Sequence, residues 1–310
     1  MSTASLHPIT AAREMAGDIK LAHSVFALPF ALLASFMAVP GSDAGWRGID
    51  WSRFGGQLAL IVLAMVLART VAMLANRYLD RNIDARNPRT AGRAIPAGRL
   101  SPGQVLMAIL LLGGAFVLTC GGFGVFFGNW WPLLLSLPVL FWISAYGWFK
   151  RFTKWCHLYL GSSLAISPLA AAIAIQPASL GAQPALWLLA LMVLSWVAAF
   201  DIIYALQDIE IDRKEGLHSI PSRLGMERGL WISRALHTIS AAALAAAWFM
   251  DERFSVLFGI GVVCVVALLI YEHATVSRWG TKKIALAFFT LNGVISCSLG
   301  VLGCLDIVLN

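Results

Sequence analysis

The chain alternates long apolar stretches with short polar segments. Each apolar stretch is roughly 18 to 25 residues long, which lets a helix cross about 30 Å of hydrocarbon. The pattern predicts about nine transmembrane helices, near 20–39, 56–79, 103–127, 129–148, 157–176, 185–206, 229–250, 254–272 and 284–308. The polar start from Met1 to Lys20 runs directly into the first span, so we expect no cleavable signal peptide. The predicted fold is an all-α polytopic membrane protein.

The composition supports this prediction. Hydrophobic residues make up 59% of the chain and charged residues 13%, and the mean hydropathy is +0.77. Soluble domains carry about 25% charged residues, so an ordinary soluble protein is excluded. The five cysteines lie in or beside apolar segments without metal-ligand spacing. This is typical of small core residues and implies no disulfide framework.

The distribution of Lys and Arg predicts the orientation of the helices, because cytoplasmic loops of membrane proteins collect these residues. With the N-terminus inside, all but three of the 23 lie in the N-terminal arm and in the loops after the even-numbered spans, with their flanks. The exceptions are Arg47, Arg53 and Arg253. We therefore expect an inner-membrane protein with a cytoplasmic N-terminus. The net charge of +7 is mostly topogenic and anion-binding, and it gives no reason to propose nucleic acid as a partner.

A polar motif closes the span at 56–79. Asn76, Asp80 and Asp84 occur there at i, i+4 and i+8, a spacing that keeps the three side chains near one face of a helix. Carboxylates at the end of a helix that has just crossed a membrane are costly, and they usually mark a functional site. The alternative is that these are helix-end carboxylates paired with arginines of the following loop.

The same arrangement recurs after the span at 185–206, where Asp201, Asp208 and Asp212 stand at i, i+7 and i+11, again on one helix face. The predicted topology places both motifs at the cytoplasmic ends of their helices. Two clusters of hard oxygen ligands suit Mg²⁺, which prefers carboxylates and commonly bridges them to substrate phosphates. The predicted metal ligands are Asn76, Asp80, Asp84, Asp208 and Asp212. This pattern predicts an intramembrane enzyme that acts on a diphosphate.

A weak internal repeat accompanies the two motifs. Each aspartate pair is followed by a loop containing Ile-Pro and Arg, at 95–100 and at 220–224, and the aspartates are offset by 128 positions. We interpret residues 1–310 as one transmembrane domain with two related halves, roughly 20–148 and 157–272. A final helix at 284–308 is added to them.

Four segments carry a resemblance to a known family. They are NRYLDRNIDARNPRTAGRAIPAG (76–98), DIIYALQDIEIDRKEGLHSIPSRLG (201–225), KRFTKWCHLYLG (150–161) and HSVFALPFALL (23–33). In these segments, which are spread over most of the chain, the protein resembles the UbiA family of intramembrane prenyltransferases. The two aspartate motifs, in this order and spacing, are specific.

The resemblance implies a nine-helix bundle with a lateral opening to the lipid. It also implies Mg²⁺-dependent transfer of an allylic group from a polyprenyl diphosphate to an acceptor, often an aromatic ring. The segments at 76–98 and 150–161 look most like 4-hydroxybenzoate polyprenyltransferases and the related enzymes that prenylate a dihydroxynaphthoate in menaquinone synthesis. Arg77 departs from the family pattern, because many relatives carry a second acidic residue after the Asn.

The residues near the motifs suit this chemistry. Breaking an allylic C–O bond leaves a carbocation and a diphosphate, whose developing negative charge metals and cationic side chains stabilise. Arg is suited to bidentate phosphate contacts and Lys acts as a point charge. The expected anion clamp is Lys150, Arg151, Arg89, Arg93 and Lys214. For the adjacent pair at 150–151 the alternative is a topogenic charge.

Aromatic side chains near the same helix ends would shelter the allylic cation from water. The candidates are Phe26, Tyr146, Phe149 and Tyr204. They are drawn from 34 aromatic residues in the chain (12 Trp, 5 Tyr and 17 Phe), so the assignment is not specific.

Four further polar residues lie in or beside apolar spans. Arg69 either binds the carboxylate of an aromatic acid acceptor or forms a salt bridge with an Asp, because a buried guanidinium is costly unless it is paired. Asp201 either orients the acceptor hydroxyl and accepts a proton, or forms a salt bridge. His23 is interpreted as a core histidine, and Asn292 as an interhelical hydrogen-bonding residue.

Two other function classes stay open. A secondary transporter would also have repeats and intramembrane charges, but its binding carboxylates should lie near the bilayer midplane beside broken helices. A phospholipid head-group transferase would use metals at a membrane surface, but its usual Asp-Gly-rich motif is absent from the sequence.

Overall fold

The described part of the chain is helical apart from turns and loops. The computed structural model describes residues 8–19, 26–39, 48–284 and 286–310. Within these ranges, eight helical segments are long and apolar enough to cross a membrane. They are α3 (Trp51–Arg86), α4 (Pro102–Phe127), α5 (Trp131–Ser144) with α6 (Tyr146–Phe149), α7 (Cys156–Ile175), α9 (Pro184–Ala205) with its extension to Lys214, α12 (Met226–Met250), α13 (Val256–Trp279), and Phe289–Leu309 with α14 (Asn292–Leu309). The predicted all-α multi-pass membrane protein is confirmed.

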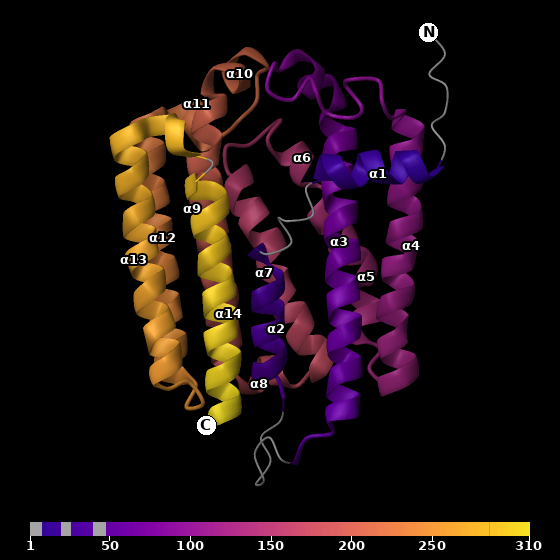
Figure 1. Ribbon diagram of the computed structural model, residues 1–310, viewed down its shortest axis with the longest axis vertical. Coiled ribbons are helices and arrows are strands. Elements are labelled where there is room, and N and C mark those ends of the chain that lie inside the picture. The colour runs from indigo at the N-terminus through magenta and orange to yellow at the C-terminus, as the bar shows by residue number, and fades with distance from the viewer. Residues whose placement is uncertain (1–7, 20–25, 40–47, 285) are drawn as a thin grey trace.

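A shorter apolar helix, α2 (Leu28–Met37), occupies part of the first predicted span, near 20–39. Residues 20–25 of that prediction, including His23, lie outside the described ranges. Phe30, Leu33 and Met37 are fully buried, and α2 lies in the middle of the bundle between α14 and α3 (Figure 1). The eight spans and α2 agree with the predicted bundle of about nine helices.

Other short elements connect the long helices. They are α8 (Ser179–Ala182), the 3₁₀ turn η4 (Gly280–Lys283) and the π-helix η5 (Leu286–Leu291). The long helices extend beyond their predicted limits in several places, most clearly in α3 and α13. Hydropathy locates only the apolar part of a helix, whereas backbone hydrogen bonding continues into polar segments that favour helix.

The helix α3 carries the first motif as a continuous extension of its span. Its start is fixed by Asp50, whose carboxylate accepts a hydrogen bond from the backbone N–H of Arg53 at 3.0 Å, as an N-cap residue does. The helix then continues to Arg86, beyond the predicted end at residue 79. Asp80 and Asp84 are therefore held on the last turns of a rigid helix.

The second motif is not on one continuous α-helix, contrary to the predicted spacing. The helix α9 ends at Ala205, a 3₁₀ turn, η3 (Leu206–Asp208), follows, and α10 (Ile209–Lys214) resumes the α-helix before α11 (Ile220–Leu224). A 3₁₀ turn has three residues per turn, so it changes the direction of the side chains that follow it. The positions of Asp208 and Asp212 relative to Asp201 therefore differ from those on an ideal helix.

The core of the bundle is built around α9. Every residue from Ser195 to Ile203 is buried, and α9 packs against α7 and α12. The indole N–H of Trp196 donates to the amide oxygen of Asn292 on α14 at 2.8 Å. This bond confirms the predicted interhelical role of Asn292, and it satisfies two polar groups that would otherwise be costly in the interior.

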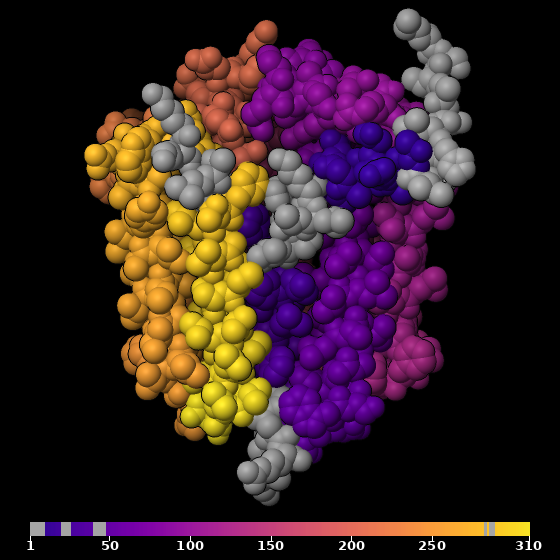
Figure 2. Space-filling view, in the orientation of Figure 1, coloured from indigo at the N-terminus to yellow at the C-terminus, as the bar shows by residue number. Residues whose placement is uncertain are grey.

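Glycines allow two pairs of helices to approach closely. A Cβ on Gly161 of α7 would lie 2.3 Å from the backbone oxygen of Leu194 on α9. A Cβ on Gly300 of α14 would lie 2.6 Å from Pro29 of α2. Small residues at such contacts are the usual way to bring membrane helices together. In Figure 2, α2 is set back between α14 and α3, so this face of the bundle is hollowed.

The helix α1 (Pro8–Ile19) crosses α3 and α4 at the end of the bundle that carries the motifs (Figure 1). Ala11 and Ile19 are buried against a cluster from α3, α4 and the loop between them. Asp18 of this helix lies 3.6 Å from the guanidinium of Arg77. Arg77, the departure from the family pattern, is thus paired with α1.

Candidate active site

The first corner of the site consists of two buried carboxylates at the end of α3. Asp80 is 1% exposed and Asp84 is 5% exposed. The ammonium group of Lys150 forms an ion pair with Asp80, and the guanidinium of Arg151 lies 3.8 Å from the other oxygen of the same carboxylate. Arg93 donates from one nitrogen to both oxygens of Asp84, at 2.7 Å each. Each buried negative charge is therefore compensated, as burial requires.

The second corner lies at the end of α9 and on α10. The guanidinium of Arg89 donates to both oxygens of Asp208, at 3.1 and 2.7 Å, and its third nitrogen donates to the phenol oxygen of Tyr204 at 3.1 Å. Asp212 accepts a hydrogen bond from the hydroxyl of Ser219 at 2.7 Å. The guanidinium of Arg89 also lies 5.6 Å from the centre of the Tyr204 ring.

Contacts between the two motif loops bring the corners together. Arg89 follows the first motif and Asp208 belongs to the second, so their pair joins segments that are 119 residues apart. Arg86 and Glu215 form a second such pair, with a distance of 2.8 Å between Nε and Oε2. The backbone N–H of His218 donates to the backbone oxygen of Lys150 at 2.6 Å. The motifs and the segment at 150–151 therefore form one polar end of the bundle.

Asp201 lies deeper in the bundle than Asp208, on the buried part of α9. Its carboxylate accepts hydrogen bonds from Nδ1 of His157 at 2.7 Å and from the phenol of Tyr146 at 3.4 Å. The other ring nitrogen of His157, Nε2, accepts from the backbone N–H of Ile220 at 3.2 Å. Because Nε2 is an acceptor there, the proton of the neutral ring is on Nδ1 and points at Asp201.

Two of the predicted substrate-binding residues form no hydrogen bond or ion pair with the motif carboxylates among the described residues. Lys214 is exposed at the end of α10, and its charge acts on Glu215. Arg69 lies on the same face of α3 as Asp80, three turns deeper. Among the described residues, Arg69 forms no ion pair or hydrogen bond. The described residues therefore provide no salt bridge for Arg69, which was one of its two predicted roles.

The remaining predicted site residues have identified neighbours. The amide of Asn76 lies beside α6, 3.7 Å from where a Cβ on Gly147 would be. Phe149 stacks on Tyr159, with 3.7 Å between ring centres, and Phe26 packs against Phe200. These two Phe rings are thus engaged in aromatic packing.

Two charged groups outside the membrane-spanning segments have shifted pKa values. The hydrogen bond from Arg86 lowers the pKa of Glu215, with further help from the charges of Arg86 and Lys214. Burial opposes the charged form of Arg89, but the charge of Asp208 and the hydrogen bonds to Asp208 and Tyr204 outweigh it and raise the pKa of Arg89. Both groups are therefore held in their charged forms at neutral pH.

The donor set fits a hard divalent cation. The four motif carboxylates offer oxygen atoms only, which is the ligand chemistry that Mg²⁺ prefers. Oδ1 of Asp80 is buried and accepts no hydrogen bond in the described part of the chain. Within the described residues, no three His, Cys, Asp or Glu side chains already lie as a closed metal cluster. In this structure the carboxylates of Asp80, Asp84 and Asp208 are paired with Lys150, Arg93 and Arg89.

Comparison with known proteins identifies the family. The sequence model of the UbiA prenyltransferase family matches residues 27–294, which includes both aspartate motifs. The chain belongs to this family. A 4-hydroxybenzoate octaprenyltransferase of Saccharophagus degradans is 32% identical over 248 residues, which cover 79% of this chain and 77% of the relative. A 4-hydroxybenzoate octaprenyltransferase of Aeromonas hydrophila is 31% identical over 242 residues, 76% of this chain and 79% of the relative.

Solved structures share the UbiA fold. The apo structure of a UbiA homolog from Aeropyrum pernix K1 superposes with a TM-score of 0.74 at 25% identity, covering 93% of this chain and 97% of the homolog. A UbiA homolog from Archaeoglobus fulgidus bound to GPP and Mg²⁺ superposes with a TM-score of 0.70 at 18% identity, covering 95% and 99%. The sequence-based identification of a UbiA-family prenyltransferase is thus confirmed.

Several residues of this candidate site have no motif that identifies them in the sequence. His157 is the clearest case, since it is 2% exposed and bonds Asp201. Its position two residues after the segment at 150–155, at the start of an apolar span, is a signal for it in the sequence. Ser219 and Glu215 carried no comparable signal, because short polar loops contain many such residues.

Proposed function

We propose that this protein transfers a polyprenyl group from a polyprenyl diphosphate to a ring carbon of an aromatic acid in quinone biosynthesis. The proposed acceptor is 4-hydroxybenzoate. The observation that carries the proposal is that Lys150, Arg93 and Arg89 converge on motif carboxylates at one end of the bundle. The curated relatives named above act on 4-hydroxybenzoate, which supports this acceptor.

The cations form the proposed diphosphate site. In the structure, Arg89 presents two nitrogens to the two oxygens of Asp208, and a phosphate offers the same pair of acceptors. Lys150 and Arg151 together face Asp80. When a diphosphate binds, we expect these side chains to turn from the carboxylates to the phosphate oxygens. The exchange keeps every charge paired, so it avoids burying a bare ion.

The same carboxylates would then hold Mg²⁺. The proposed ligands are Asn76, Asp80, Asp84, Asp208 and Asp212, and the support is their oxygen chemistry and their common end of the bundle. The bound ion would stabilise the negative charge that develops on the diphosphate. The Archaeoglobus fulgidus homolog with Mg²⁺ and GPP is consistent with this cofactor.

The reaction requires that an electron-rich ring meet the allylic cation. The allylic C–O bond breaks and its electron pair leaves with the diphosphate, a ring carbon forms the new C–C bond, and that carbon then loses its proton. We assign Arg69 to the acceptor carboxylate, because a half-buried guanidinium without a partner among the described residues suits an anionic ligand. We assign Asp201, held by His157 and Tyr146, to the acceptor hydroxyl or the departing proton.

We also propose that the aspartate end faces the cytoplasm and that the protein resides in the inner membrane. Most Lys and Arg of the chain lie at this end, including the loop at 87–101 and the segment at 150–154. Cytoplasmic loops carry such an excess. This orientation would give soluble acceptors and Mg²⁺ access from the cytoplasm.

The test uses the purified full-length protein in detergent with a series of labelled prenyl diphosphates. The acceptor is either 4-hydroxybenzoate or 1,4-dihydroxy-2-naphthoate, and Mg²⁺ is present or removed with EDTA. We expect one pyrophosphate per prenylated 4-hydroxybenzoate, with the new bond ortho to the hydroxyl, and no turnover after metal removal. If product forms only with the naphthoate, the naphthoate replaces 4-hydroxybenzoate as the proposed acceptor. Movement of the diphosphate across vesicles without pyrophosphate release would favour a transporter.

A further inference from the structure

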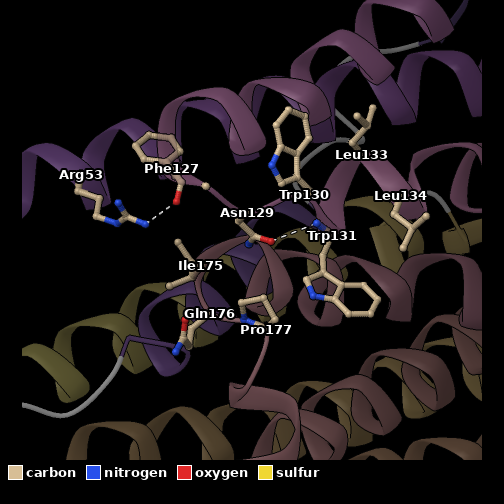
Figure 3. A pocket seen from close by; sticks show the side chains of 11 residues that line it. Arg53, Phe127, Asn129, Trp130, Trp131, Leu133, Leu134, Ile175, Gln176 and Pro177 are labelled. Atoms are coloured by element: carbon tan, nitrogen blue, oxygen red, sulfur yellow. Dashed lines mark hydrogen bonds between the residues drawn. The ribbon is translucent and has the colours of Figure 1, made fainter.

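A second concave site lies at the opposite end of the bundle from the aspartates. It is a pocket of about 720 Å³, within the usual range of about 300 to 1,000 Å³ for small-ligand sites. The start of α3, the turn between α4 and α5, and the end of α7 form its walls (Figure 3). Arg53 and Asp80 are 27 positions apart on the same helix, which corresponds to about 40 Å. This pocket is therefore separate from the candidate active site.

Arg53 supplies the charge of the pocket and is held in place. One guanidinium nitrogen donates to the backbone oxygen of Phe127 at 2.9 Å, and the guanidinium lies 5.4 Å from the centre of the Phe127 ring. Among the described residues, no carboxylate forms an ion pair with Arg53, and none lines the pocket. The guanidinium thus has donors left for an anion.

Three other side chains add neutral donors to the wall. Trp130 and Trp131 are 55% and 51% exposed, and Gln176 is exposed just after the end of α7. In the described structure, the indole N–H groups and the amide of Gln176 are not used in hydrogen bonds. Figure 3 shows them around the same opening as Arg53. Tryptophans in this position are typical of the membrane interface.

Three carbonyl oxygens at the end of α7, which would repel an anion, accept hydrogen bonds from side-chain amides. The amide nitrogen of Asn129 donates to the backbone oxygens of Ile173 and Ala174, at 2.7 and 3.1 Å. The buried amide of Gln57 donates to the oxygens of Ala174 and Ile175 at 3.3 Å each. Both amides therefore satisfy backbone oxygens at the end of α7, and Asn129 also ties the turn before α5 to α7.

An apolar stripe leads from the pocket toward the middle of the membrane. Leu134 lines the pocket, and Leu137 and Phe141 follow on α5 at i+3 and i+7, which places all three on one helix face. They are 67%, 66% and 69% exposed. A stripe of this kind suits an acyl chain, because it continues from the pocket directly into hydrocarbon.

We propose that this pocket binds the head group of an anionic phospholipid, from the leaflet that faces away from the aspartate end, with an acyl chain on the α5 stripe. Arg53 contacts the phosphodiester, and the indoles and Gln176 donate to the phosphate and glycerol oxygens. A zwitterionic head group binds more weakly, because it would bring an ammonium group close to Arg53 in a pocket whose lining has no carboxylate. The inference does not depend on the proposed prenyl transfer.

The test measures lipid binding to the full-length protein in an uncharged detergent by native mass spectrometry. The probes are palmitoyl-oleoyl phosphatidylglycerol and palmitoyl-oleoyl phosphatidylcholine, which share their acyl chains. We expect one phosphatidylglycerol to bind at least about tenfold more tightly than phosphatidylcholine. Arg53→Gln should weaken phosphatidylglycerol binding by about tenfold or more and leave phosphatidylcholine binding within about twofold.

Matched variants separate the pocket from general effects on the membrane interface. Trp131→Phe removes an unpaired indole donor and should weaken phosphatidylglycerol binding about threefold. Trp187→Phe, at the same end of the bundle but outside the pocket, should change nothing measurable. Arg53→Lys keeps the charge without the forked geometry and should bind at an intermediate level, which also provides a test if Arg53→Gln fails to fold.

Three results would overturn the proposal: equal binding of the two lipids to the wild-type protein, wild-type phosphatidylglycerol affinity in Arg53→Gln, or equal losses in Trp131→Phe and Trp187→Phe. Glycerol 1-phosphate should not displace the lipid at millimolar concentration, and displacement would show a site for free phosphate instead. Turnover in detergent without added lipid should be unchanged in Arg53→Gln, because the residue lies about 40 Å along α3 from Asp80.

Discussion

The guanidinium of Arg89 forms two hydrogen bonds with the carboxylate of Asp208, at 3.1 and 2.7 Å. The pair joins the loop after the first aspartate motif to the second motif itself. Without a ligand, Arg89 compensates the charge of Asp208, whose side chain is only 18% exposed. In the proposed complex it would pair with phosphate, so one side chain serves both states.

Arg89→Gln tests this exchange. We expect kcat/KM for the prenyl diphosphate to fall by about 10²-fold, because a charged group aimed at the leaving diphosphate is lost. The KM for the aromatic acid should change by less than about threefold. Arg86→Gln is the matched control, since Arg86 also joins the two loops but pairs with Glu215, which lies outside the motifs. Equal losses in the two variants would show that loop pairing, and not phosphate contact, is what matters.

The motif carboxylates should be essential. Asp80→Asn, Asp84→Asn, Asp208→Asn and Asp212→Asn are each expected to lower kcat by about 10²- to 10³-fold or more at saturating Mg²⁺. Each substitution keeps the size of the side chain, but at Asp80, Asp84 and Asp208 it leaves a cation unpaired. The thermal transition in detergent must therefore show that the variant is folded before its activity is compared. Near wild-type turnover in any one variant would remove that residue from the proposed site.

Arg69→Leu tests the acceptor assignment. The KM for 4-hydroxybenzoate should rise by about tenfold or more, while the KM for the prenyl diphosphate stays within about threefold, because orientation of the ring is lost selectively. The thermal stability should be unchanged or higher, since Arg69 forms no ion pair with any described residue and a half-buried charge without a partner is costly. A parallel rise in both constants, or a loss of folding, would assign Arg69 to structure.

Gly161→Ala should destabilise the bundle. The added Cβ would lie 2.3 Å from the oxygen of Leu194, so α7 and α9 would have to separate. We expect a loss of about 1 to 3 kcal/mol, as for other overpacked contacts. Gly114→Ala on α4 is the control, because a Cβ there meets no atom within 4 Å. A stable Gly161→Ala protein with an unchanged thermal transition would contradict the close packing of these helices.

The orientation is open to cysteine labelling in a variant that lacks the five native cysteines. New cysteines in the loops around Arg86 and Glu215 should react from the cytoplasmic side of sealed vesicles. One near Asp43 should react only from the other side. Labelling of the two motif loops from opposite faces is incompatible with a shared site, and labelling of both from outside would reverse the proposed orientation.

The local properties of this protein were predictable from its sequence. A run of about 20 apolar residues identifies a membrane-spanning helix whatever surrounds it, and the spans from α3 to α14 lie where the apolar runs are. The spacing of Asp80 and Asp84 is likewise a property of one helix. The family resemblance rested on these local motifs and was confirmed by the match over residues 27–294. The two-halves interpretation stays a prediction.

The partners of these residues were decided only by tertiary structure. Arg89 reaches Asp208, Lys150 reaches Asp80 and His157 reaches Asp201 across gaps of 119, 70 and 44 residues. Such contacts depend on which helices pack together and on where a helix such as α9 breaks into a 3₁₀ turn. Hydropathy and helical periodicity describe one segment at a time. They contain no information on which of several cations a packed bundle brings to a given carboxylate.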